Sequence, residues 1–214
     1  MKTHHTLTFL LPLTMATAAC SESLTSTSPL AAEPAEAAIA AVPACVDFEL
    51  PLPAGTIWGA SVAQPPLTLV HAENGIRVYT EKFFLTGGGT AYRDARIGIP
   101  PVAFAAGQAA RTLHINLIFD FTSVGFTPSS YTFNYLDVNG PQAYENLRVN
   151  ASPVFIGELD TPPAFLGGVP ISFAGGPFAV PPIGDRGTLK LGAGVGRLTV
   201  GGQDLWIDHI CAYP

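Results

Sequence analysis

The sequence predicts an all-β protein, built as an antiparallel, jelly-roll-like β-sandwich with long Gly- and Pro-rich loops. From Cys45 onward, short segments in which apolar and polar residues alternate are separated by Gly, Pro and Asn. No part of this region has the 3.6-residue period of a long helix. Many short strands with frequent turns are typical of sandwiches and jelly rolls. No internal repeat is evident, so we do not expect a propeller or a solenoid.

The clearest strand pattern lies in Thr112–Phe121. Its apolar residues recur at every second position, and only Ile118 departs from the alternation. A period of two over this length predicts a half-buried strand with one face toward the core. A turn at Thr127–Ser130 and a second strand at Tyr131–Val138 follow.

Shorter alternating segments predict the remaining strands. They lie at Cys45–Leu50, Leu67–His71, Ile76–Phe84, Asn146–Asn150, Val154–Leu159, Val169–Phe173, Gly187–Leu191, Arg197–Val200 and Asp204–Ala212. Asn74-Gly75 between two of them is typical of a tight turn. Thr86–Gln108 and the Gly- and Pro-rich Gly175–Gly187 are expected to be the long loops.

The chain divides into three parts. Residues 1–19 have the pattern of a secretory signal peptide, with Lys2 before an apolar run and the small residues Ala16–Ala19 at its end. Residues 20–44 consist mainly of Ser, Thr, Ala, Pro and Glu without an aromatic residue, which is the composition of a flexible linker. Residues 45–214 form the predicted sandwich domain. The apolar run is shorter than the ~20 residues of a membrane-spanning helix, so we expect an exported protein.

Cys20 stands at the expected cleavage point and has two possible fates. Thr17-Ala18-Ala19-Cys20 resembles the lipobox of bacterial lipoproteins, whose Cys is acylated, although that motif usually has Leu where this chain has Thr17. Lipidation predicts an outer-membrane or cell-surface lipoprotein whose membrane contact is made only through the lipid on Cys20. Ordinary cleavage near Cys20 predicts a secreted protein instead.

The other two cysteines, Cys45 and Cys211, bracket the predicted domain. Export implies an oxidising compartment, where cysteines pair. Using Cys20 for a lipid leaves one pair, and the terminal strands of jelly rolls often lie side by side. We therefore expect a Cys45–Cys211 disulfide.

Two resemblances are carried by the ends of the domain. Cys45–Glu49 and Gly201–Cys211, with Glu145–Asn150 between them, are similar to an uncharacterised family of exported bacterial proteins, which implies a family but no activity. The same terminal segments resemble the end strands of galactose-binding-like jelly rolls, which include many carbohydrate-binding modules. That resemblance implies carbohydrate binding and one structural calcium between the first and last strands.

The calcium ligands expected from the residues are Asp47, Glu49 and Asp208. Asp208 alternates with Trp206 and Ile210, so its carboxylate is expected on a buried face, where it needs a partner. Asp47 and Glu49 lie close by if the terminal strands pair, and three carboxylates repel one another unless a cation balances them. Calcium suits such oxygen ligands. The alternative is that Asp208 accepts backbone hydrogen bonds at the sheet edge.

Aromatic side chains are the candidates for sugar binding because they stack on pyranose rings. The predicted ligand residues are Trp58, Tyr79, Tyr92 and Tyr135, with Tyr131 and Tyr144 as further candidates. The alternative is that these rings cover sandwich edges and keep one polar tip in water.

Charge and motifs limit the function. The chain carries 10 basic and 16 acidic residues, a net charge of −6, and it lacks the basic stripe of a nucleic-acid binder. It contains no Gly-x-Ser-x-Gly, His-Glu-x-x-His or Walker motif. We therefore expect a non-catalytic binding module whose partner is a glycan or a cell-envelope component. A structural or adhesive envelope protein is the alternative, and a glycan-acting hydrolase is the third possibility.

Overall fold

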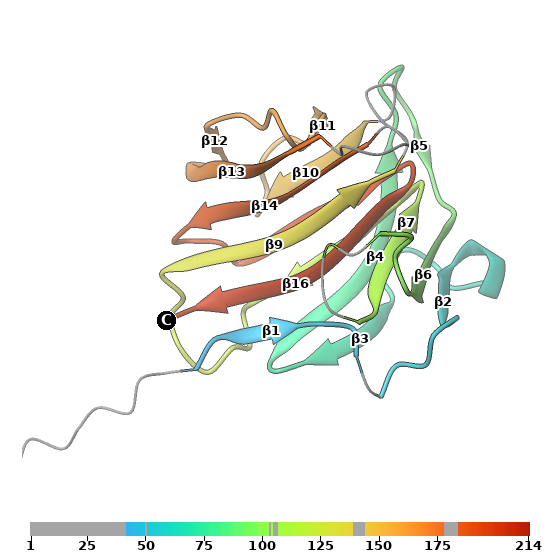
Figure 1. Cartoon of the computed structure of the whole chain (residues 1–214), viewed down its shortest axis with the longest axis horizontal. Coiled ribbons are helices and arrows are strands. Elements are labelled where there is room, and N and C mark those ends of the chain that lie inside the picture. The colour runs from blue at the N-terminus through green and yellow to red at the C-terminus, as the bar shows by residue number, and fades with distance from the viewer. Residues whose placement is uncertain (1–41, 50, 103, 105–106, 139–143, 178–183) are drawn as a thin grey trace, which may run out of the picture. The chain divides into compact units, whose positions relative to one another are not determined.

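A computed structural model describes residues 42–49, 51–102, 104, 107–138, 144–177 and 184–214. These residues form two antiparallel sheets packed as a β-sandwich (Figure 1), which confirms the prediction of an all-β sandwich. The predicted signal peptide, Cys20 and the linker up to residue 41 lie outside the described residues. Within the described part of the chain, no helix is long and apolar enough to cross a membrane.

The larger sheet has nine strands within the described residues. Its order is β12 (Phe165–Leu166), β13 (Val169–Pro177), β14 (Asp185–Gly192), β9 (Ser130–Asp137), β16 (Leu205–Tyr213), β7 (Ala109–Leu113), β6 (Asp94–Gly98) and β2 (Ile57–Gly59), with β1 (Ala44–Val46) paired to β16. Figure 1 shows β1, β16, β9, β14 and β13 side by side as one layer.

The second sheet has seven strands within the described residues. Its order is β11 (Phe155–Gly157), β10 (Glu145–Val149), β15 (Arg197–Gly202), β8 (Ile115–Asp120), β4 (Ile76–Phe84) and β3 (Leu69–Glu73), with β5 (Thr90–Ala91) paired to β4. One short 3-10 helix, η1 (Ala60–Val62), follows β2.

The core lies between the two sheets. Val78, Leu117 and Leu198 from the seven-stranded sheet and Phe133 and Ile207 from the nine-stranded sheet are all fully buried there. Each such side chain contributes about 1.5–3 kcal/mol when it leaves water. The alternation in the sequence therefore reflects one apolar face on each sheet.

The prediction of one continuous strand over Thr112–Phe121 is wrong, because the chain turns a corner at His114. That residue adopts a left-handed conformation with φ 51°, so the chain leaves β7 in one sheet and enters β8 in the other. Thr112 is buried before this corner and Ile115 is buried after it, so the alternation of buried and exposed positions does not continue through His114. A period of two cannot reveal this corner, because each sheet presents an apolar face to the same core.

Both predicted loops contain strands. Thr86–Gln108 includes β5 and β6, and Gly175 and Gly187 pair with each other in the β13–β14 hairpin. Glycines carry no side chain to show an alternation, so the sequence conceals these strands. The Phe173 ring covers the glycine pair, because a Cβ at Gly187 would lie 2.1 Å from the Phe173 ring.

The first and last strands are joined covalently. Cys45 lies directly opposite Cys211 in the β1–β16 ladder, and the two form a disulfide that closes 166 residues of sequence separation. This confirms the predicted pairing.

Candidate functional site

A hollow of about 350 Å³ opens at one end of the sandwich. It lies where the β8–β9 connection meets the turn between β14 and β15. The residues that line it are mostly apolar or small: Phe121, Thr122, Val124, Phe126, Thr127, Pro128, Tyr131, Gly194, Val195 and Gly196.

Two aromatic rings form the floor of this hollow. Phe121 and Tyr131 are almost fully buried, and their ring centroids lie 4.8 Å apart. Val124 and Phe126 are half-buried and pack against the core at the wall. Burial raises the pKa of the Tyr131 phenol, although a hydrogen bond from the Val195 backbone opposes the shift. The floor is therefore neutral at physiological pH.

Asn150 fixes the turn on one side of the hollow. Its Nδ2 donates to the Gly194 carbonyl at 2.9 Å, and its Oδ1 accepts from the backbone N–H groups of Gly196 at 2.8 Å and Arg197 at 3.1 Å. One side chain thus satisfies three backbone groups of the β14–β15 turn. The rim is ordered before any ligand arrives.

The β3–β4 hairpin supports the opposite side. Asn74 and Gly75 have φ values of 48° and 81°, as a two-residue type I′ turn requires. A Cβ at Gly75 would lie 2.8 Å from the Ser123 carbonyl oxygen and 3.2 Å from the Val124 Cα. Only glycine lets the hairpin approach the loop that carries Val124 and Phe126.

None of the lining residues is an acid, a lysine, an arginine or a histidine. The carboxylate of Asp120, the residue before Phe121, is occupied by its neighbours: Oδ1 accepts from the Thr122 backbone at 3.0 Å and hydroxyl at 2.6 Å, and Oδ2 accepts from Arg197 Nε at 3.0 Å. Burial alone would raise the pKa of Asp120, but these hydrogen bonds outweigh it and lower the pKa. The hollow can therefore hold a small neutral ring and lacks groups for proton transfer.

The four predicted sugar-binding aromatics do not share a surface. Trp58 is buried against Phe48, Tyr135 is fully buried beside Phe173, and neither lines the hollow. The half-buried Tyr92 donates its hydroxyl to Thr80 Oγ1 at 2.9 Å.

Tyr79 is the member of the predicted set that lies on an outer face. It is half-buried and stands opposite Ile118 on the side of β4 that faces away from the core. Sequence reasoning named Tyr131 among the candidates but passed over Phe121 and Phe126. The available signal was two apolar residues, Val124 and Phe126, inside a segment otherwise made of turn residues.

The predicted calcium ligands gather at the terminal strands but do not converge. Asp47 Oδ1 lies 2.7 Å from His209 Nδ1, and Glu49 Oε1 accepts from the Gln108 backbone at 2.6 Å. Asp208 is buried, and its Oδ1 has no hydrogen-bond partner. Among the described residues, these three acids do not form a group whose oxygens all lie within 4.8 Å of one another.

Burial raises the pKa of Asp208 to about 8, and the negative charges of Asp47, Glu49 and Glu73 add to this. A backbone hydrogen bond from His209 acts in the opposite direction. Burial and these neighbouring charges thus favour the protonated form of Asp208.

Comparisons with protein-family models, with curated proteins and with solved structures found no match to this chain. The resemblance of its ends to exported bacterial proteins and to carbohydrate-binding jelly rolls stays a prediction. The function is therefore inferred from the geometry of the hollow.

Proposed function

We propose that this protein is a non-catalytic binding module that holds a sugar ring of a glycan in the hollow at the β8–β9 end of the sandwich. The observation that carries the proposal is a preformed hollow with aromatic walls and no ionisable group apart from the neutral Tyr131 phenol. A pyranose is a neutral ring with apolar C–H faces, so aromatic side chains suit it. One pyranose ring fits within the hollow, whose volume is about 350 Å³.

The rim supplies the polar contacts that a sugar needs. Thr122, Thr127 and Gly194 are exposed around the opening, and they offer hydroxyl and backbone groups beside the rings. A few polar groups around an apolar pocket are typical of small-ligand sites. A hydrolase would need two carboxylates across the bound sugar, and the lining contains none.

Glycan-array screening of the purified protein, followed by titration calorimetry with the best ligand, tests this proposal. Phe126→Ala should weaken binding about 10- to 100-fold, because a lost aromatic contact at such a site costs about 1–3 kcal/mol. Tyr79→Ala is the matched control, since it removes a half-buried aromatic ring from another surface. It should leave affinity unchanged.

Two results would overturn the proposal. One is the absence of any glycan ligand for the wild-type protein. The other is loss of binding in Tyr79→Ala with full binding in Phe126→Ala, which would place the sugar on the outer face of the seven-stranded sheet.

One observation favours the alternative, a structural or adhesive role in the cell envelope. β3 is an edge strand of the seven-stranded sheet; Leu69 at its start is 51% exposed, and Leu67 just before it is 65% exposed. Exposed edges with apolar side chains are sites of strand pairing between molecules. A concentration-dependent dimer in analytical ultracentrifugation that Leu69→Lys abolishes would support this role.

A further inference from the structure

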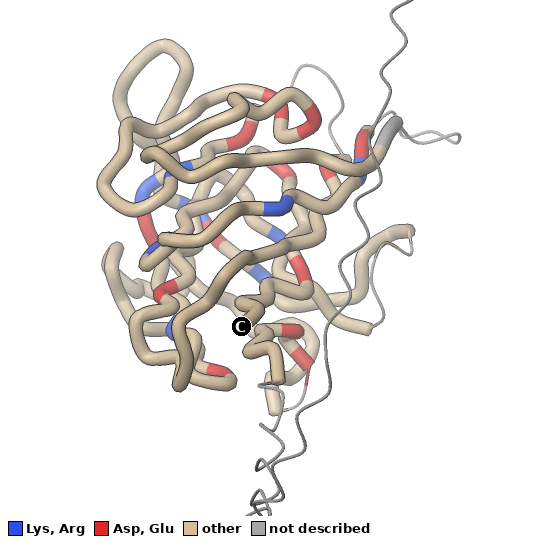
Figure 2. The backbone as a smooth tube through the Cα atoms, turned by 90° about the vertical axis from the view of Figure 1, so that its left-hand side faces the viewer, with Lys and Arg blue, Asp and Glu red and all other residues tan. Residues whose placement is uncertain are grey.

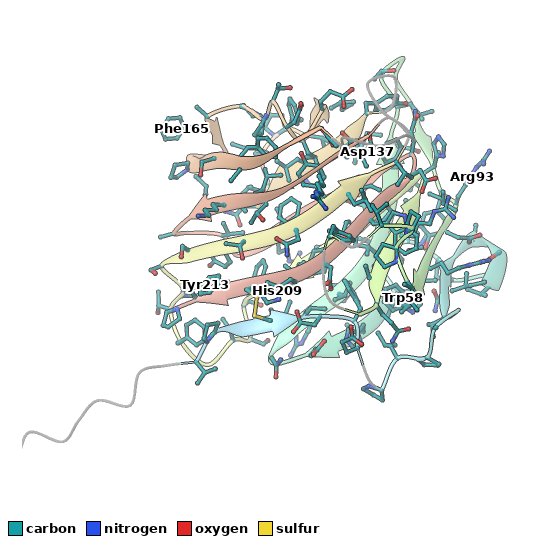
Figure 3. All side chains as sticks on the ribbon, viewed as in Figure 1. Trp58, Arg93, Asp137, Phe165, His209 and Tyr213 are labelled. Atoms are coloured by element: carbon teal, nitrogen blue, oxygen red, sulfur yellow. A yellow bond between two sulfur atoms is a disulfide. The ribbon has the colours of Figure 1, made fainter. Side chains whose placement is uncertain are left out.

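Five carboxylates gather at the end of the sandwich opposite the hollow. Asp137 ends β9 and Asp185 begins β14, whereas Tyr131 and Gly192 lie at the other ends of these strands. Figure 2 shows acidic positions close together in the upper part of the domain, and Figure 3 places Asp137 well away from His209.

The other three acids come from the second sheet and the segment that follows it. Glu145 begins β10, and Glu158 and Asp160 follow β11. The carboxylate oxygens of Asp137, Glu145 and Glu158 all lie within 4.8 Å of one another, and those of Glu158, Asp160 and Asp185 form a second such group. Glu158 belongs to both, so the five acids make one continuous cluster, named here the five-acid cluster.

Glu145 is one of the most deeply buried residues of the cluster. It is only 1% exposed, and its carboxylate accepts a hydrogen bond from the Leu159 backbone. Its Oε1 has no hydrogen-bond partner, and neither does Oδ1 of Asp160. Buried oxygens without partners are costly, so these atoms point to a ligand that the chain itself does not supply.

Tyr135 gives a second, independent indication. Its side chain is fully buried, and its hydroxyl has no hydrogen-bond partner. Asp185, Asp160, Glu145 and Asp137 are the charged neighbours that, after burial itself, raise its pKa. A buried phenol normally donates to a nearby oxygen. Here it faces four carboxylates without bonding to any, as expected when an ion or its bound water occupies the space between them.

The ion pairs that Arg111, Arg148, Arg197, His71 and His209 form are with acids outside the cluster. Burial, with the charges of Asp137, Glu158 and Asp185, raises the pKa of Glu145 to about 9. Burial and its neighbours raise the pKa of Asp185 to about 7. Both shifts have the same cause, which is the gathering of several carboxylates in one buried place.

We propose that Asp137, Glu145 and Glu158 bind a divalent cation of the calcium class, with Asp160 and Asp185 beside them. Calcium takes six to eight oxygens at about 2.3–2.6 Å, and oxygens that lie within 4.8 Å of one another can all reach one such ion. Magnesium demands a tighter octahedron and gives up its water reluctantly. The carboxylates are also closer together than the ~5–10 Å that a glycosidase leaves for its substrate.

The ion would join the two sheets. Asp137 and Asp185 belong to the nine-stranded sheet, whereas Glu145 belongs to the seven-stranded sheet. The disulfide ties β1 to β16 near Thr132, toward the other end of β9. Calcium and the disulfide thus fasten opposite ends of the same sandwich, and the cation site is independent of the sugar-binding hollow.

Metal binding can be measured on the full-length protein after removal of bound metal with a chelator. Calorimetry should show saturable binding of calcium and weaker binding of magnesium. Calcium at 100-fold above Kd should raise Tm by about 5–10 °C. Glu145→Gln keeps the shape of the side chain but removes its charge, so it should fold without metal and lose most of this Tm shift.

Asp208→Asn is the matched control. It neutralises another buried carboxylate, the one predicted from the sequence as a calcium ligand, and it should keep the full calcium response. Terbium luminescence gives a second readout, since a tyrosine next to the bound lanthanide sensitises its emission. Tyr135→Phe should reduce that emission severalfold compared with Tyr79→Phe.

The proposal fails if wild-type protein binds no calcium in calorimetry and its Tm is unchanged by calcium or chelator. It also fails if calcium raises the Tm of Glu145→Gln as much as that of wild type but does not raise the Tm of Asp208→Asn. That result would place the ion at the terminal strands. Loss of the calcium response in Asp160→Asn, with Glu145→Gln unaffected, would contradict the assigned triad.

Discussion

At the scale of single residues, Asp208 shows how burial changes the role of a carboxylate. Asp208 lies on β16, where the negative charges of Asp47 and Glu49, and of Glu73 from β3, act on it. His209 is engaged with Asp47. With no positive partner in this set, the carboxyl of Asp208 is neutral in the folded protein near pH 7.

This state makes stability depend on pH. The pKa of Asp208 is about 8 when folded against an ordinary value of 3.8, so the folded chain binds one more proton between these values. The free energy of unfolding should fall as pH rises from 4 to 8, by at most ~1.4 kcal/mol per pH unit. Asp208→Asn should lack this contribution and be more stable than wild type at pH 8.

Urea unfolding of both proteins at pH 5 and pH 8 measures the difference. The stability gap in favour of Asp208→Asn should widen by at least about 1 kcal/mol between the two pH values. Parallel pH profiles would show that Asp208 is ionised in the folded protein.

At the scale of elements, the turns position the candidate site. The β3–β4 hairpin and the β14–β15 turn flank the hollow, the first through Gly75 and the second through Asn150. Their role is to hold Val124, Phe126 and Val195 around the two floor rings.

Gly75→Ala should therefore disturb both stability and ligand binding. The residue has φ 81°, and the new methyl group would meet the Ser123 carbonyl. We expect a loss of about 1–3 kcal/mol in the free energy of unfolding. Binding in the hollow should weaken as well, since the loop carrying Phe126 must shift.

Gly87→Ala is the control, because nothing lies within 4 Å of a Cβ at that position and its φ is ordinary. Thermal melting of the two variants gives the comparison. Equal Tm values would show that the approach of the hairpin to Ser123 does not constrain the fold.

At the scale of the whole molecule, the disulfide links the two ends of the domain. Replacing both Cys45 and Cys211 with Ser should lower the free energy of unfolding by about 2–5 kcal/mol. A reductant should destabilise wild type by a similar amount and have no effect on the double variant. Equal urea midpoints for oxidised wild type and the double variant would show that the bond adds no stability.

Cys20 carries the prediction about where the molecule resides. If the host reads Thr17-Ala18-Ala19-Cys20 as a lipobox, the acyl chains anchor the protein in a membrane. Cys20→Ser should then move the protein from the membrane fraction to the soluble fraction of the expressing cells. Unchanged partitioning would leave the secreted alternative.

The sequence by itself determined the all-β class, most strand positions and the disulfide. These features depend on local alternation and on cysteine placement at the domain ends, which are properties of short segments and of chain order. Where a segment lacked that local signal, as at Gly175–Gly187, a strand was missed.

Only the tertiary structure decided which side chains meet. The alternation through Thr112–Phe121 conceals the corner at His114, because both sheets face one core. Phe121, Phe126 and Val195 are brought together by loops from separate strands, and Glu145 reaches Asp137 and Glu158 across the two sheets. The sequence predicted Tyr135 as a surface ligand, yet strand register buries it beside the five-acid cluster. Such contacts depend on register and sheet packing, which no local pattern encodes.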